Sequence, residues 1–183
     1  LIIKLMPISN KLWENNFDLA LLSLQTNFVQ GIKTGNLPIN IFQEYVAQDY
    51  FFLESFARAY GSAVSKSKDK NSIKSLSQLL VGVSEELILH ETYAKKWDID
   101  LTNNQIKPAT KNYTDFLDQV SNKQSAVEIM FAMTPCMRLY SWIGKSLSDN
   151  ILNNPSKGYK LSMNAYEDVK KYLVRSFETF RNP

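Results

Sequence analysis

Residues 132–147 repeat apolar and small side chains at helical spacing and contain the chain's single cysteine. One face of this helix would collect Met133, Cys136, Met137, Tyr140, Ile143, Gly144 and Leu147. This stripe predicts a long helix with Cys136 and Tyr140 pointing inward. Pro135 lies inside the pattern, and because proline has no backbone N–H, it should either kink the helix or leave one carbonyl of the preceding turn without its helical partner. An inward thiol at such a position favours a pocket, although a lone buried cysteine also serves as a small hydrophobic residue without chemistry.

The same spacing of three and four residues recurs in most of the remaining chain. It predicts helices over 10–24, 28–32, 38–60, 72–90, 110–120 and 166–180, with N-caps at Ser9 or Asn10, at Ser72, and at Thr110 or Asn112. Only six glycines and six prolines occur in 183 residues, which favours helices over short strands. We therefore expect one domain over residues 1–183 with an all-α fold, a single helical bundle.

Charge and composition argue against several classes of partner. The net charge is +3 and the lysines are dispersed, so a basic surface for nucleic acid is not expected. No stretch reaches the roughly 20 apolar residues of a membrane-spanning helix, and the apolar opening 1–6 is short and interrupted by Lys4. A single cysteine excludes an intrachain disulfide, which suits a cytoplasmic protein.

Asp49 is the one charged residue on the inward face predicted for 38–60. The other members of this face are Phe42, Tyr45, Val46, Phe52, Leu53, Phe56 and Tyr60. A carboxylate at a core position costs several kcal/mol unless it is paired. Asp49 therefore either has a structural partner, such as Arg58, a tyrosine or a helix end, or faces a polar ligand. The surrounding aromatic side chains favour a pocket for a planar, nitrogen-rich small molecule.

His90 is the only histidine and lies near Glu85, Glu86 and Glu91. This composition raises the question of a metal site. Di-metal carboxylate sites in helical bundles use a pair of Glu-x-x-His elements, and this chain has one histidine. No metal site is expected on that ligand count.

Several short motifs occur in a fixed order between residues 12 and 150. They are Leu12-Trp13-Glu14, 28–32 (FVQGI), 35–38 (GNLP), 45–53 (YVAQDYFFL), 85–87 (EEL) with His90, Pro108 to Thr110 with 113–117 (YTDFL), and Pro135-Cys136 through Tyr140 to 143–145 (IGK). In order and spacing this set resembles the TenA (thiaminase II) family. Because it has Cys136, the chain resembles the cysteine-bearing branch of this family.

The resemblance implies a heme-oxygenase-like helical bundle without heme, usually a homotetramer, with no cofactor or metal. It also implies a role in thiamin salvage. The family reaction converts 4-amino-5-aminomethyl-2-methylpyrimidine into hydroxymethylpyrimidine and ammonia, and many members also cleave thiamin slowly. The expected partner is a small aminopyrimidine or thiamin-related substrate, with no nucleic acid and no membrane.

The resemblance also assigns roles to residues at matching positions. Cys136 is implied as the nucleophile that adds to the pyrimidine ring. Asp49 is implied as the carboxylate that binds the amino and nitrogen edge of the ring and helps activate the thiol. Phe52 would stack on the ring, and Tyr113 and Tyr140 would place hydroxyls at the pocket.

The C-terminal part departs from the family pattern. Family members end in a helix whose Tyr-Glu motif supplies an acid-base glutamate, and on this alignment that last helix has no counterpart. Tyr166-Glu167 and Phe177-Glu178 are fallback matches, so the glutamate stays unassigned. The alternative to a hydrolase is a non-catalytic pyrimidine-binding or regulatory relative.

Overall fold

The computed structural model describes residues 8–101 and 104–152, and all regular structure within these ranges is helical. The helices are α1 (Ile8–Asn15), α2 (Phe17–Leu24), α3 (Asn27–Thr34), α4 (Ile39–Lys66), α5 (Lys70–Lys96), α6 (Pro108–Lys123) and α7 (Ala126–Leu152). The all-α fold class predicted from the sequence is confirmed. The predicted helix over 166–180 and both fallback Tyr-Glu matches lie outside the described residues.

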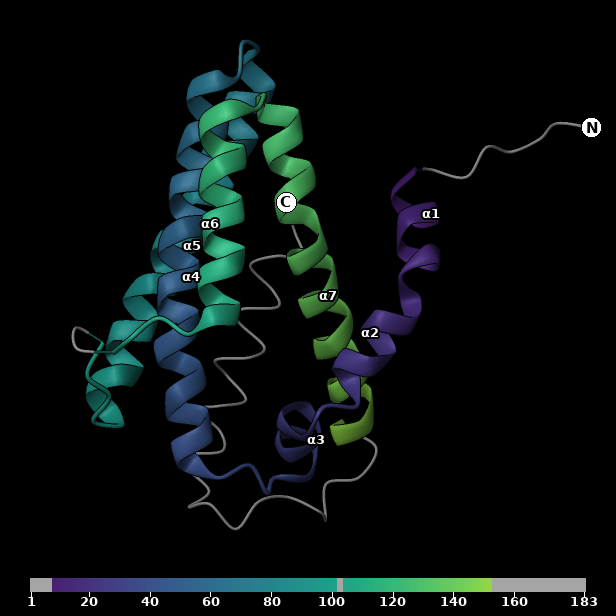
Figure 1. Cartoon of the computed structure of the whole chain (residues 1–183), viewed down its shortest axis with the longest axis vertical. Helices are drawn as coiled ribbons and strands as arrows, with labels where there is room; N and C mark the ends of the chain where they lie inside the picture. Colours follow the sequence, from purple (N-terminus) through teal and green to yellow (C-terminus); the bar gives the residue numbers. More distant parts are fainter. Residues whose placement is uncertain (1–7, 102–103, 153–183) are drawn as a thin grey trace, which may run out of the picture.

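The four long helices run alternately up and down the bundle (Figure 1). α4 is central, because it packs against α5, α6 and α7, and α6 also packs against α7. The short α4–α5 and α6–α7 connections lie at the same end, at the top of the view. The short helices α1 and α2 run beside α7, and α3 lies at the opposite end of the bundle.

The larger hydrophobic core forms where the four long helices meet. Its buried residues are Leu53, Phe56, Ala59, Tyr60 and Ala63 of α4, Leu76 and Val83 of α5, Leu117 of α6, and Ile129 and Met133 of α7. Leu53, Phe56, Tyr60 and Met133 belong to the predicted inward stripes, and the core extends beyond these stripes to Ala63 and Ile129. Since Asp49 and Phe52 precede this core along α4 and Cys136 follows Met133 along α7, the core fixes both helices beside the site.

The turn that leads into α4 is set by local sequence. Gly35 ends α3 in the left-handed conformation, with φ at 78°, which glycine adopts at no steric cost. The Asn36 and Leu37 N–H groups then donate to the Gly31 carbonyl. Pro38 precedes the first residue of α4, as its fixed φ favours.

Three predicted helix starts are wrong. The segment 10–24 forms two helices that break at Asn16, and because α1 begins at Ile8, Ser9 and Asn10 lie inside it. Asp69, not Ser72, caps α5, because its carboxylate accepts the Ser72 N–H. α6 begins earlier than expected, at Pro108. Proline suits this position because the N–H groups of the first helical turn have no acceptor within the helix, so its lack of an N–H costs no hydrogen bond.

α7 keeps Pro135 in its interior, as the sequence predicted. Its outer side contacts the N-terminal helices, where Trp13, Phe17 and Trp142 meet edge to face and Arg138 lies over the Trp13 ring. Within the described ranges, every helix is too short or too polar to cross a bilayer.

Candidate active site

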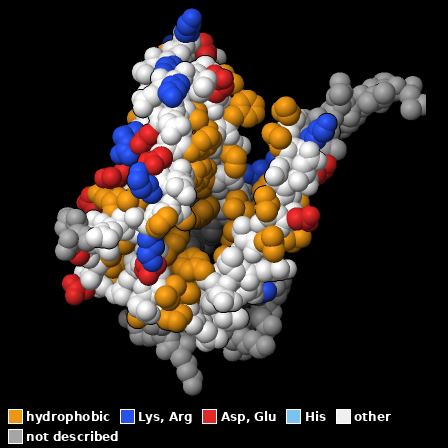
Figure 2. Space-filling model, viewed as in Figure 1, with side chains coloured by type: hydrophobic (Ala, Val, Ile, Leu, Met, Phe, Trp, Pro, Cys, Tyr) orange, Lys and Arg blue, Asp and Glu red, His pale blue; other side chains and the backbone are white. Residues whose placement is uncertain are grey.

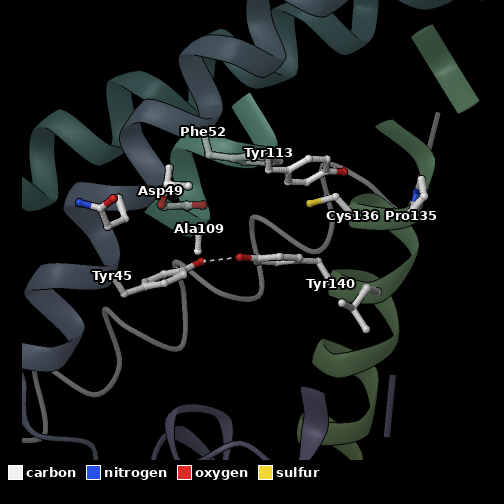
Figure 3. A pocket seen from close by; sticks show the side chains of 11 residues that line it. Tyr45, Asp49, Phe52, Ala109, Tyr113, Pro135, Cys136 and Tyr140 are labelled. Atoms are coloured by element: carbon white, nitrogen blue, oxygen red, sulfur yellow. Dashed lines mark hydrogen bonds between the residues drawn. The ribbon is translucent and has the colours of Figure 1, made fainter. Parts of the chain in front are cut away.

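A cavity of about 450 Å³ lies between α4, α6 and α7 (Figure 3). It is lined by Tyr45, Gln48, Asp49 and Phe52 of α4, by Ala109, Thr110 and Tyr113 of α6, and by Pro135, Cys136, Leu139 and Tyr140 of α7. Hydrophobic side chains gather along the hollow between α7 and the neighbouring long helices (Figure 2). The cavity is therefore mostly apolar and aromatic, with a carboxylate, a thiol and hydroxyls as its polar groups.

Helical spacing explains why these side chains converge. Tyr45, Asp49 and Phe52 follow one another at one-turn steps on α4. On α7, Cys136 and Tyr140 are also one turn apart. The structure thus brings together all five residues singled out in the sequence, namely Asp49, Phe52, Tyr113, Cys136 and Tyr140.

Asp49 forms a hydrogen bond with His90. Its Oδ2 lies 3.0 Å from His90 Nε2, and the side chains are 12% and 0% exposed. The sequence had offered Arg58, a tyrosine or a helix end as structural partners of Asp49, but Arg58 lies 3.8 Å from Asp118 instead. Asp49 therefore has a structural partner, the buried His90, and also lines the predicted pocket.

The tautomer of His90 follows from its second contact. Nδ1 lies 3.0 Å from the backbone carbonyl of Glu86, which can only accept, so Nδ1 carries a proton. Burial alone would lower the pKa of His90, but the hydrogen bond and charge of Asp49, together with Glu86, raise the pKa overall. The ring therefore favours its doubly protonated form beside the Asp49 carboxylate.

Hydroxyl groups bridge the helices around the cavity. The Tyr45 and Tyr140 hydroxyl oxygens are 3.3 Å apart, and the Tyr113 hydroxyl donates to the Ala132 carbonyl at 3.3 Å. The Phe52 and Tyr113 rings lie 5.2 Å apart at an angle of 32°. Aromatic rings and hydroxyl groups therefore lie along the wall of the cavity, as suits a flat ligand.

The surroundings of Cys136 favour the protonated thiol. Burial raises the pKa of Cys136 well above its usual range, and the charge of Asp49 raises the pKa further. Burial likewise raises the pKa of Tyr140, as do Asp49 and Cys136. Nucleophilic chemistry at Cys136 would need a base during the reaction, and Asp49 is the carboxylate that lines the same cavity.

Gln48 fixes the loop before α6. Its Nε2 donates to the Gln105 carbonyl at 2.9 Å, and its Oε1 accepts the Lys107 N–H at 2.8 Å. This pair of bonds holds the start of α6, and with it Ala109 and Thr110, at the cavity. Gln48 was not predicted as a site residue, because a polar residue beside an inward stripe gives no signal of its own.

The described residues contain no group of three or more His, Cys, Asp or Glu side chains arranged to hold a metal ion. His90 instead takes part in the two hydrogen bonds described above.

Comparison with known proteins identifies the family of this chain. Residues 26–180 match the model of the TENA/THI-4/PQQC family. The chain belongs to this family. The resemblance inferred from the motifs is thereby confirmed.

Two curated relatives illustrate the similarity. The chain is 32% identical over 175 residues to the protein named bifunctional TH2 protein, mitochondrial, of Arabidopsis thaliana, covering 82% of this chain but 28% of that protein. It is 31% identical over 150 residues to an aminopyrimidine aminohydrolase of Halalkalibacterium halodurans, covering 79% of this chain and 67% of the relative.

Solved TenA structures share the fold. The TenA homologue from P. horikoshii OT3 superposes with a TM-score of 0.75 at 22% identity, over 96% of this chain and 92% of that one. The putative TenA-like thiaminase of Sulfolobus solfataricus gives a TM-score of 0.71 at 22% identity, over 96% and 81%.

Proposed function

We propose that this chain is an aminopyrimidine aminohydrolase of thiamin salvage. Its substrate would be 4-amino-5-aminomethyl-2-methylpyrimidine, and its products hydroxymethylpyrimidine and ammonia. The observation that carries the proposal is the convergence of Asp49, Cys136 and four aromatic side chains on one cavity. The name of the Halalkalibacterium relative supports the same reaction.

Asp49 and the aromatic residues would bind the pyrimidine. The Asp49 carboxylate would accept N–H groups from the amino and nitrogen edge of the ring. Phe52 would stack on the ring face, and the hydroxyls of Tyr113 and Tyr140 would lie at its edge. A cavity of about 450 Å³ has ample room for one such ring.

Cys136 would act as the nucleophile. As its proton passes to Asp49, Sγ forms a bond to a ring carbon, and the electron pair released into the ring expels the exocyclic amine from its methylene. The amine takes up a proton and leaves as ammonia. Water then adds to the methylene, and the S–C bond breaks to restore the thiol. The net change is replacement of an amine by a hydroxyl with consumption of one water.

Ammonia release from 4-amino-5-aminomethyl-2-methylpyrimidine tests the proposal directly. The full chain should release one ammonia per hydroxymethylpyrimidine formed, and thiamin should be cleaved more slowly. Calorimetric binding of hydroxymethylpyrimidine in the same samples separates the alternatives. Binding without ammonia release would favour a non-catalytic pyrimidine-binding relative, and neither binding nor release would contradict both functions.

The acid-base glutamate of this reaction is unassigned, since its fallback positions lie outside the described residues. The single-domain organisation, a homotetramer and a cytoplasmic location likewise stay predictions. Gel filtration with light scattering would test the assembly.

A further inference from the structure

His90 lies behind the proposed site rather than in it. Its side chain is fully buried and is not among the residues that line the cavity, whereas its partner Asp49 lines it. Val83, Glu86 and His90 follow one another at helical spacing on the side of α5 that is buried. The packing of α5 on α4 therefore places an imidazole against the back of the Asp49 carboxylate.

The two nitrogens of the His90 ring make different hydrogen bonds. Nδ1 must donate to the Glu86 carbonyl, which fixes the ring plane and leaves Nε2 directed at Asp49 Oδ2. A hydrogen bond from Nε2–H to a carboxylate is charge-assisted and restricts rotation of that carboxylate. The Glu86 carbonyl thus orients His90, and His90 orients Asp49.

We propose that His90 is a positioning residue, whose Nε2–H holds the Asp49 carboxylate in the orientation that binds the ring and receives the thiol proton. The effect of His90 on turnover rests on the proposed function, while its hydrogen bond to Asp49 does not. Without this donor, a carboxylate that is only 12% exposed would lose a hydrogen bond and could rotate.

Two amide variants separate the nitrogens of His90. In His90→Gln the side-chain amide reaches the place of Nε2, and in His90→Asn it reaches that of Nδ1. We expect the Gln variant to keep kcat/KM within about threefold, and the Asn variant to lose about 10- to 100-fold, as for a lost hydrogen bond to a charged group. Thermal melts of both variants check that they fold. Equal activity of the two folded variants would overturn the proposal.

A double-mutant comparison distinguishes positioning from a general structural contribution. Because His90 acts through Asp49, adding His90→Asn to Asp49→Asn should cause no further loss of hydroxymethylpyrimidine affinity, which calorimetry measures without turnover. An additional 10-fold loss in the double variant would overturn the proposal.

NMR tests the pair without any substrate. His90 is the only histidine of the chain, so protein labelled with 15N-histidine gives the signals of one imidazole. We expect both ring nitrogens to be protonated at pH 6.5, and the Nε2 shift to change in Asp49→Asn. An unprotonated Nε2, or a spectrum unaffected by Asp49→Asn, would overturn the proposal. Absence of turnover in the unmodified protein would count against the proposed function alone, because the NMR result would still decide the pair.

Discussion

The hydroxyl oxygens of Tyr45 and Tyr140 lie 3.3 Å apart and connect α4 with α7 across one wall of the cavity. Both residues line the cavity, at one turn from Asp49 and from Cys136 respectively. The bond therefore couples the helix that bears the carboxylate to the helix that bears the thiol. It also restricts the direction in which the Tyr140 hydroxyl can meet a ligand.

This relationship predicts unequal effects of two tyrosine substitutions. Tyr140→Phe removes the hydroxyl proposed to meet the ligand and should weaken hydroxymethylpyrimidine binding about 10-fold. Tyr45→Phe removes only its orienting partner and should weaken binding by about threefold. Calorimetry measures both, with Tyr50→Phe as the control, because Tyr50 lies on α4 but does not line the cavity. A larger effect of Tyr45→Phe than of Tyr140→Phe would contradict the assignment.

The reactivity of Cys136 should depend on Asp49. Burial and then the Asp49 charge raise the pKa of the thiol, so little thiolate is present at pH 8. Asp49→Asn should therefore speed alkylation of Cys136 by iodoacetamide while it abolishes turnover. Asp115→Asn removes an exposed carboxylate of α6 outside the cavity and serves as the control. Equal alkylation rates in Asp49→Asn and the unmodified protein would argue against electrostatic coupling of the two side chains.

The stability of the fold should fall across the pH window that opens at about 6.5, the unfolded-state pKa of histidine. The charged groups that act on His90 are Asp49 from α4 and Glu86 from α5, and its folded-state pKa is raised. A raised pKa means that the stabilisation is fully present below the unfolded value of about 6.5 and is lost as the pH rises through the folded pKa. Urea unfolding should show this decline, and His90→Gln should flatten it. A free energy of unfolding that rises across this window would contradict the charged pair.

Two glycine substitutions should change stability in opposite directions. An added Cβ at Gly61, inside α4, meets no atom within 4 Å, so Gly61→Ala should raise the free energy of unfolding by about 0.5–1 kcal/mol. At Gly31 the Cβ would lie 3.2 Å from the Leu37 Cα, so Gly31→Ala should lower it by about 1 kcal/mol. Urea titration of both variants measures the difference, and stabilisation by Gly31→Ala would mean that the α3–α4 turn adjusts freely.

Much of the fold and site could be predicted because helical periodicity fixes which side chains face inward. The stripes of 38–60 and 132–147 correctly placed Asp49 and Cys136 towards the interior, and the cavity lies where α4 and α7 meet. Helix starts were predicted less well, because several polar residues near each end can cap. At the start of α5, Ser72 was the predicted cap, but its N–H donates to the side chain of Asp69, which is the actual cap.

The Asp49–His90 pair could not be assigned from either helix alone, because each stripe shows only one half of it. A signal was nonetheless present. Both residues occupy inward positions on consecutive helices, at about five to six turns from the short connector, which is the register of an antiparallel helix pair. Gln48, by contrast, depends on the path of the loop at 105–107, which sequence periodicity does not describe.

The most direct test of the proposed reaction compares turnover and binding in Cys136→Ser. The substitution changes one atom in a cavity whose other proposed binding groups are untouched, so hydroxymethylpyrimidine should bind within about threefold of the unmodified protein. Ammonia release from 4-amino-5-aminomethyl-2-methylpyrimidine should fall by at least about 1,000-fold, since a serine hydroxyl is a far weaker nucleophile than a cysteine thiol. Ammonia release at the unmodified rate would show that Cys136 is not the nucleophile and would contradict the proposed mechanism.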